Sequence, residues 1–566
     1  MLRRGLIFLP LVWVAAVSGG SGGLGVGGVP ESRSAPEALH ASIGPSSPGA
    51  GTAVEEPRAW KEAYATILTA DLQSHEVALA SPELEGRNTP SAGLARAAEY
   101  IERHFRDAGL EPLPSASTGT GASDASFRWT YTRMIQRAEP EGCALTLEVT
   151  GGEPKTFALG TDFVPVVGAD GRGDGPLLFC GYGINAPKER WEEVKGKAFK
   201  GAIAMLVESE PRHAKLFDGP EITREAELYE KLGDLAAAGV DGVIVVRRPP
   251  ERPAKPKFGP RPEPVPLSLR SDWASWNDGR TFQTPSPPEG LPPTVEVTPE
   301  VAAALLGQDV LELAAKIDKL GKSQQLAPKG RTVRLAAATK AVETELENVV
   351  GIVRGTDEAL AREYVVLGAH YDHIGVDSAG RIGCGADDNA SGTAALIELA
   401  QAFAVAPPRR SVLCIAFSGE EHGLWGSQAF CQRPPLAPES FTAMINMDML
   451  GRGEPEEVAV LGIPQNPELE KVLNRAKALS KTGVTKLIVR QGEELFQRSD
   501  HFSFHQIGVP VLFFFEGLPI EKNKDYHTWR DTIEALDFDK LTRSTRLVFN
   551  SAWLLANDDD RPPKPR

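Results

Sequence analysis

Apolar and polar positions follow the most regular pattern after residue 347. Four apolar runs rich in β-branched and aromatic residues predict buried strands there, at 364–369, 411–417, 442–447 and 509–515. A stretch with helical periodicity, 392–403, lies between the first two runs. Buried strands that alternate with helices are typical of an α/β fold. We therefore expect a three-layer α/β sandwich with a mostly parallel central sheet.

The pattern before residue 347 predicts further, smaller units. Apolar residues at helical spacing predict a helix over 94–108, and a strand-like segment follows at 143–149. Farther along, a smaller β-rich domain is predicted from three strands and one helix, at 177–180, 202–207, 243–246 and 223–238. Two proline-rich stretches, 249–266 and 284–293, are predicted loops because proline cannot sit inside a regular ladder.

The N-terminus has the pattern of a secretory signal. Two arginines, Arg3 and Arg4, precede an apolar run at 5–17, and small residues follow from Ser18. The alternative is a membrane anchor, but the run is shorter than the roughly 20 residues that span a bilayer. We expect the signal to be removed, the protein to be exported to the periplasm or the extracellular space, and no membrane-spanning segment to remain.

The predicted organisation follows from these patterns. In chain order it consists of a signal peptide (1–22), a disordered Gly/Ser/Pro-rich leader (23–57), the N-terminal part of the main domain (58–152), an inserted domain (153–300), a connecting segment (301–346), the main domain (347–557) and a polar tail (558–566).

Composition limits the classes of partner. The net charge of −15 argues against a nucleic-acid partner, which would favour clustered lysine and arginine. Five scattered cysteines are too few for a disulfide framework.

Acidic and histidine residues fall at the ends of the predicted strands. In a parallel sheet such ends gather ligands along one edge. His370 and Asp372 follow the first strand and are two residues apart, so their side chains point to the same face. The carboxylate can then orient an imidazole that binds a metal ion. Asp448 follows another strand, where a carboxylate would be poorly solvated.

Two acidic pairs lie near these positions. Asp387 and Asp388 stand in a loop that enters a helix, where a carboxylate can bridge two metal ions or simply cap the helix. The side chains of Glu420 and Glu421 diverge, so one can bind a metal ion while the other acts as a general base. Two exposed glutamates at a helix start are the alternative for this pair.

Taken in order, the motifs His-x-Asp, Gly-Ala-Asp-Asp, Glu-Glu-x-Gly-Leu-x-Gly-Ser, Asn-Met-Asp-Met and Tyr-His-Thr resemble those of the co-catalytic zinc aminopeptidases. This family includes the bacterial leucyl aminopeptidases, with glutamate carboxypeptidase and glutaminyl cyclase as relatives. The resemblance covers 347–557 and extends more weakly to 60–110. It implies the zinc-exopeptidase fold, of the phosphorylase/hydrolase-like class. The inserted domain, with its segment 181–187, resembles a protease-associated (PA) domain.

The resemblance also implies a di-zinc site and a mechanism. Two Zn²⁺ per chain would be held by His370, Asp387, Glu421, Asp448 and His527. Asp387 would bridge the ions, with His370 and Asp448 completing one site and Glu421 and His527 the other.

Two further residues have implied catalytic roles. Glu420 would be the general base that acts with a metal-bridging hydroxide, and Asp372 would orient His370.

One position departs from the family pattern. Some members carry a tyrosine three residues before the Ser499-Asp500-His501 motif, where it helps to stabilise the oxyanion, and this chain has Phe496 there. Oxyanion stabilisation is then expected from zinc or another donor. Ser499, Asp500, His501 and Phe496 are the candidates for the substrate pocket, and a structural role is the alternative for the first three.

The sequence therefore predicts an exported aminopeptidase acting on peptides with a free N-terminus. A carboxypeptidase of the same superfamily would need a cationic group for the substrate carboxylate. A glutaminyl-cyclase-like enzyme would use one zinc ion. A non-catalytic binding protein would have lost a ligand or the base, and none is lost here.

Overall fold

The computed structural model describes residues 57–113, 126–213, 216–217, 226–248, 289–376, 381–479, 482–515 and 520–565. The predicted signal peptide lies outside these residues, as do the predicted leader up to residue 56 and the proline-rich stretch 249–266. Within the described part of the chain, no helix has both the length and the apolar character needed to cross a membrane.

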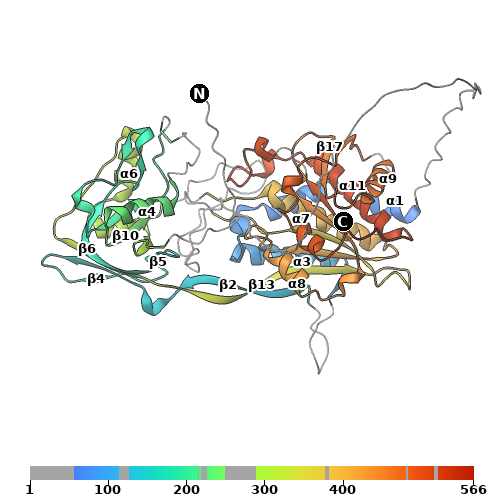
Figure 1. Cartoon of the computed structure of the whole chain (residues 1–566), viewed down its shortest axis with the longest axis horizontal. Coiled ribbons are helices and arrows are strands. Elements are labelled where there is room, and N and C mark those ends of the chain that lie inside the picture. Colours follow the sequence, from blue (N-terminus) through green and yellow to red (C-terminus); the bar gives the residue numbers. More distant parts are fainter. Residues whose placement is uncertain are drawn as a thin grey trace, which may run out of the picture. The chain divides into compact units, whose positions relative to one another are not determined.

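A nine-stranded mixed sheet forms the main domain (Figure 1). Its four central strands run parallel, in the order β15 (Ser411–Phe417), β14 (Tyr364–His370), β16 (Phe441–Asp448) and β19 (Val511–Phe515). Every residue of these four strands is buried. Strands covered on both faces read as continuous apolar runs, which is why the sequence predicted them closely.

The outer strands of this sheet are mostly antiparallel to their neighbours. β13 (Thr339–Val353) pairs with β15, and β17 (Glu457–Leu461) pairs with β19. The sheet is completed by β1 (Glu111–Pro112), β2 (Arg128–Ala138) and β18 (Lys486–Ile488).

Helices cover both faces of the main sheet, which confirms the predicted α/β sandwich. One face shares an apolar core with α1 (Arg58–Tyr64), α2 (Thr69–Leu79), α3 (Ala92–Asp107), α7 (Gly392–Val405), α9 (Leu469–Leu479) and α11 (Phe538–Asn557). The other face packs against α8 (Trp425–Gln432) and α10 (His501–Gln506). Alternate residues of β14 show this division, since Val365 and Leu367 join the first core and Val366 joins the second.

A second sheet of eight strands lies between β2 and β13 in the sequence. Its parallel part contains β6 (Gly171–Phe179), β9 (Ile203–Val207), β10 (Gly242–Val246) and β11 (Thr294–Val297). Antiparallel strands flank it: β3 (Ala144–Val149), β4 (Lys155–Thr156), β5 (Phe163–Pro165) and β12 (Arg331–Ala337). The helix α4 (Leu228–Ala238) packs on one face, and α5 (Pro299–Leu306) and α6 (Val310–Leu320) pack on the other.

This second sheet is larger than the inserted domain predicted at 153–300. β3 precedes that range and β12 follows it, and these two strands pair directly. The segment 301–346, predicted as a connection, also contributes α5 and α6, whose residues Val301, Leu305 and Ile317 are buried in the second core. The two ends of an inserted unit must return to neighbouring positions, and here they do so by pairing as strands.

Candidate metal centre

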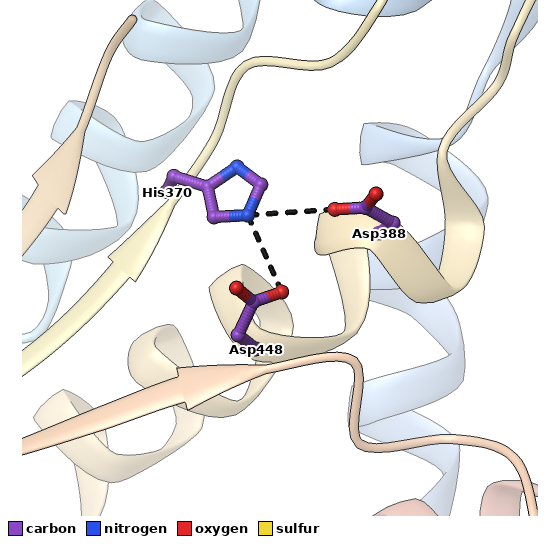
Figure 2. Close-up of side chains that lie close together, drawn as sticks. All are labelled: His370, Asp388 and Asp448. Atoms are coloured by element: carbon purple, nitrogen blue, oxygen red, sulfur yellow. Dashed lines mark ion pairs between the residues drawn. The ribbon is translucent and has the colours of Figure 1, made fainter. Parts of the chain in front are cut away.

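Three side chains converge at the carboxyl edge of the main sheet (Figure 2). His370 is the last residue of β14, Asp448 is the last residue of β16, and Asp388 lies in the turn before α7. His370 Nε2 is 3.4 Å from Asp388 Oδ1 and 3.3 Å from Asp448 Oδ1. All three residues are buried. They form one group that could hold a metal ion.

Asp388 also belongs to a second group. Its Oδ2 atom is 3.1 Å from His527 Nε2, which is itself 3.0 Å from Glu421 Oε2. His373 adds a third imidazole, with Nδ1 2.9 Å from Glu421 Oε1 and 3.8 Å from Asp388 Oδ2. The two oxygens of Asp388 therefore face two different sets of side chains.

Asp388, and not the predicted bridging residue Asp387, is the aspartate shared by the two groups of side chains. Asp387 Oδ1 accepts a hydrogen bond of 2.9 Å from the Gly451 N–H, and the Asp387 N–H donates to Asp531 Oδ1. Asp388 instead has a non-helical backbone conformation (φ −109°, ψ 93°), which separates its side chain from that of Asp387. The sequence shows two adjacent aspartates and carries no signal for this local geometry.

His373 was missed by the sequence analysis. It lies three residues after His370 and is fully buried against Glu421. Its place directly after the His-x-Asp motif was the available signal. A ring nitrogen that hydrogen-bonds Glu421 can orient this carboxylate, as supporting residues of metal sites do.

The electrostatics of these groups fit divalent cations. Asp388 Oδ2 and Asp448 Oδ1 are buried, and neither has a hydrogen-bond partner within the described residues, although imidazole nitrogens lie 3.1 and 3.3 Å away. Buried carboxylates without compensation are costly, and a cation between them and the imidazoles would remove that cost. Mixed carboxylate and imidazole ligands are those that zinc binds in proteins.

The pKa values show how strongly the groups interact. Burial would raise the pKa of Glu421, but His527 and His373 beside it hold this pKa well below its ordinary value. Burial opposes the charged form of His527, yet Glu421 and Asp388 raise the pKa of His527 to about 10.

Glu420 and Asp372 occupy positions consistent with the roles suggested for them. Glu420 lines the same cleft as Glu421 and Asp448. Burial raises the pKa of Glu420 well above its ordinary value, which makes its carboxylate a stronger base. Asp372 Oδ1 is 3.6 Å from His370 Nδ1 and also accepts a hydrogen bond of 3.2 Å from the Glu420 N–H.

The cleft that contains these side chains has one apolar wall. Its walls also include Met449, Leu495, Arg498, Phe513, Phe515, Ile520 and Tyr526. Arg498 Nη2 donates a hydrogen bond of 3.3 Å to the Tyr526 hydroxyl. Tyr526 and Arg498 could not be assigned to the cleft from the sequence, because they come from separate loops.

The four predicted pocket residues lie behind this wall. Ser499 donates a hydrogen bond of 2.7 Å to Asp448 Oδ2 and accepts one of 2.8 Å from Asn446 Nδ2, so it contacts a candidate ligand and does not line the cleft. His501 is buried, with its ring 4.4 Å from that of Phe513 and 5.0 Å from that of Phe496. Asp500 is also fully buried. The pocket assignment is therefore corrected to supporting positions.

Comparison with known proteins identifies the segment that carries the site. Residues 348–552 match peptidase family M28. The chain is similar to a probable leucine aminopeptidase from Arthroderma otae, with 30% identity over 215 residues covering 37% of this chain and 57% of that protein. It is also similar to a probable zinc metalloprotease from Pyrenophora tritici-repentis, with 26% identity over 261 residues covering 38% and 58%.

A solved structure gives a further comparison. BSAP, a zinc aminopeptidase from Bacillus subtilis, is 19% identical with a TM-score of 0.44, and the match covers 89% of this chain and 97% of that one. The chain spans little more than half the length of the two curated relatives named above. The segment 348–552, which matches the model of peptidase family M28, contains every residue of the two side-chain groups, from His370 to His527.

Proposed function

We propose that the protein is an exported zinc-dependent aminopeptidase that binds two Zn²⁺ and uses Glu420 as its general base. One observation carries this proposal: Asp388 directs one oxygen to His370 and Asp448 and the other to Glu421 and His527. A carboxylate shared in this way is the arrangement that places two metal ions side by side.

His370, Asp388 and Asp448 would hold one ion, and Asp388, Glu421 and His527 would hold the other. Bound there, the ions would supply Lewis acidity toward a peptide carbonyl and make water easier to deprotonate. The ligand carboxylates, Asp388, Glu421 and Asp448, carry three negative charges against four positive charges. The remaining positive charge favours an anionic nucleophile or a developing oxyanion.

The protein's own groups move the protons. The Glu420 carboxylate takes a proton from the attacking water and delivers it to the nitrogen of the leaving amine. The Tyr526 hydroxyl lies in the same cleft, and burial raises its pKa well above its ordinary value, so it stays protonated. It can donate to the oxyanion and thus replace the donor that Phe496 does not provide.

The apolar wall supports a preference for substrates with a large apolar N-terminal side chain. Met449, Leu495, Phe513, Phe515 and Ile520 would remove such a side chain from water. The similarity to a probable leucine aminopeptidase agrees with this preference.

A substrate panel tests the function directly. Leucyl-p-nitroanilide should be cleaved, whereas its N-acetylated form should not, because an aminopeptidase requires the free amine. Glu420→Gln should retain metal and lose about 10²- to 10⁴-fold in kcat, the usual contribution of a general base. Equal cleavage of the blocked substrate, or normal turnover by Glu420→Gln, would contradict the proposal.

A carboxypeptidase is the second candidate, because Arg498 provides a cationic group in the cleft. This activity would require a free C-terminal carboxylate, so C-terminal amidation of a peptide would abolish cleavage. An aminopeptidase would tolerate the amide. A single zinc ion in active protein would instead favour the cyclase-like alternative.

Export and the PA-like identity of the second sheet form part of the same proposal. The charged and apolar pattern of residues 1–22 supports export. N-terminal sequencing of protein recovered from outside the cytoplasm should begin after residue 22.

A further inference from the structure

A short segment far from the catalytic motifs in sequence, residues 86–89, contacts the loops that carry them. Its backbone pairs with the loop after β14, where the His373 N–H donates to Arg87 O (3.2 Å) and the Gly375 N–H donates to Gly86 O (3.0 Å). Gly86 has φ +70°, and a Cβ atom there would lie 2.4 Å from Gly375 O. Only glycine allows this approach. We call residues 86–89 the clasp.

The clasp also forms hydrogen bonds with the loop that leads to Asp388. The guanidinium of Arg87 is buried and donates to four backbone carbonyls, those of Leu79, Tyr371, Cys384 and Gly385. Tyr371 follows the ligand His370, and Gly385 precedes Asp388 by three residues. One side chain thus ties together two loops that carry metal-facing residues.

Thr89 links the clasp to the loop that carries Glu420. Its hydroxyl donates to Asp372 Oδ2 (3.0 Å) and accepts from the Gly419 N–H (3.0 Å), and Thr89 is 1% exposed. The other oxygen of Asp372 accepts from the Glu420 N–H (3.2 Å). Two consecutive amides of the catalytic loop are therefore held by one hydroxyl and one carboxylate that hydrogen-bond each other.

The preceding residue of this loop has separate support. The Ser418 N–H donates to Asn348 Oδ1 (3.1 Å), and the Tyr131 hydroxyl donates to Ser418 O (3.0 Å). The strand end is thus fixed without Thr89. On this loop Thr89 acts at Gly419 directly and at Glu420 through Asp372, where the loop leaves the sheet and places the base in the cleft.

We propose that Thr89 is a positioning residue for Glu420: by bridging Asp372 and the Gly419 amide, it sets the direction in which the base enters the cleft. This inference rests on the proposed function for Glu420. A threonine hydroxyl has one donor and two acceptor sites, and both kinds are used here in a buried setting. Loss of the hydroxyl would leave the Gly419 amide and one Asp372 oxygen without this partner, so the loop would relax toward other arrangements.

Kinetic measurements on the full chain test the proposal. Thr89→Val removes the hydroxyl at nearly constant shape and should lower kcat about 10- to 100-fold, as loss of supporting groups commonly does. KM and zinc content should stay close to those of the parent. Thr89→Ser keeps the hydroxyl and should restore kcat. Thr545→Val, which removes another buried threonine hydroxyl on α11, is the matched control and should keep full activity.

A double variant separates positioning from general damage. In a Glu420→Gln background, Thr89→Val should change the residual rate by no more than about twofold, because its effect acts through the base that is already lost. An equal loss in both backgrounds would overturn the proposal. So would a Thr89→Ser variant as impaired as Thr89→Val.

Amide hydrogen exchange provides a readout that is independent of activity. Thr89→Val should speed exchange at Gly419 and Glu420 and leave Ser418 unchanged, whereas Thr89→Ser should match the parent. Unchanged exchange at Gly419 and Glu420 would contradict the positioning role even in an active enzyme. If the parent had no peptidase activity but Thr89→Val still exchanged faster at Gly419 and Glu420, the proposed function would be contradicted. The role of Thr89 in holding the loop would still be supported.

Discussion

Two clusters of buried charge occupy equivalent places in the two sheets, and they differ in how their charges are satisfied. Both lie beyond the carboxyl ends of parallel strands. In the second sheet, Asp318 accepts from the Tyr182 hydroxyl (2.6 Å) and from Arg248 Nη2 (2.8 Å), while Lys231 Nζ donates to Ser209 O. In the main sheet, the carboxylates of Asp388 and Asp448 face imidazoles without hydrogen-bond geometry.

The difference shows what marks a functional site in this molecule. Ligands of parallel sheets bind beyond the carboxyl ends of the strands, and both clusters lie at such an edge. Their position in the sheet therefore does not distinguish them. The second-sheet cluster combines acids with cations: Arg248 pairs with Asp318, and Lys231 lies beside Glu193, Glu208 and Glu210. In the main-sheet cluster, several carboxylates and histidines point toward one another, on either side of Asp388. The convergence of several possible ligand atoms on one point, more than the burial of charge, therefore distinguishes the candidate metal centre.

The largest expected effect is on the main-sheet cluster. His527→Ala removes a ligand from the group containing Asp388 and Glu421 and should lower kcat/KM by more than the roughly 100-fold expected from loss of a supporting residue. Zinc binding should fall by one ion per chain. His104→Ala on α3 is the control and should retain activity. If His527→Ala bound two zinc ions and kept normal rates, the claim that the main-sheet cluster differs from the second by binding metal ions would be contradicted.

A substitution of Lys231 in the second cluster should change stability and leave activity unchanged. Lys231→Met leaves the acids around it, Glu193, Glu208 and Glu210, without their buried lysine, and should cost about 3–5 kcal/mol of stability. Chemical denaturation would measure this change. The specific activity of the folded fraction should be unchanged, and a selective loss of kcat would show that this cluster serves catalysis.

Ser499 should have an intermediate effect. Ser499→Ala removes the hydrogen bond to Asp448 Oδ2 and should weaken zinc affinity about 10- to 100-fold without lowering the maximal number of ions bound. Competition with a zinc chelator measures the affinity. Unaltered affinity would mean that Asp448 is oriented without Ser499.

The smallest effect concerns pH and the second cluster. Burial raises the pKa of Glu193 to about 7 from an ordinary value of 4.5. A raised folded-state pKa contributes stability that is present below the unfolded pKa and lost as pH rises through the folded one. The parent should therefore lose stability relative to Glu193→Gln between pH 4.5 and about 7. Thermal melts of both proteins across this range would show it, and a constant difference would contradict the shift.

The sequence predicted those parts of the molecule that local pattern determines. The buried strands at 411–417 and 364–369 were found because their apolar runs are continuous, and His370 and Asp448 were found because they end such strands. The choice between Asp387 and Asp388 depends on the backbone angles of one turn, which composition does not reveal.

Other features required long-range contacts. Thr89 and Asp372 are 283 residues apart in the chain, and nothing in either segment indicates that they meet. Arg498 and Tyr526 enter the cleft from separate loops for the same reason. β3 and β12 pair across the whole inserted unit, so the boundary at 153–300 could not be placed from local proline and glycine content.

The central claim is that Asp388 holds two metal ions between two ligand groups. Equilibrium dialysis against zinc followed by elemental analysis tests it most directly, in the parent, Asp388→Ala and Asp387→Asn. We predict two zinc ions per chain in the parent, two in Asp387→Asn, and loss of tight binding at both positions in Asp388→Ala. One ion in the parent, or two tightly held ions in Asp388→Ala, would contradict it.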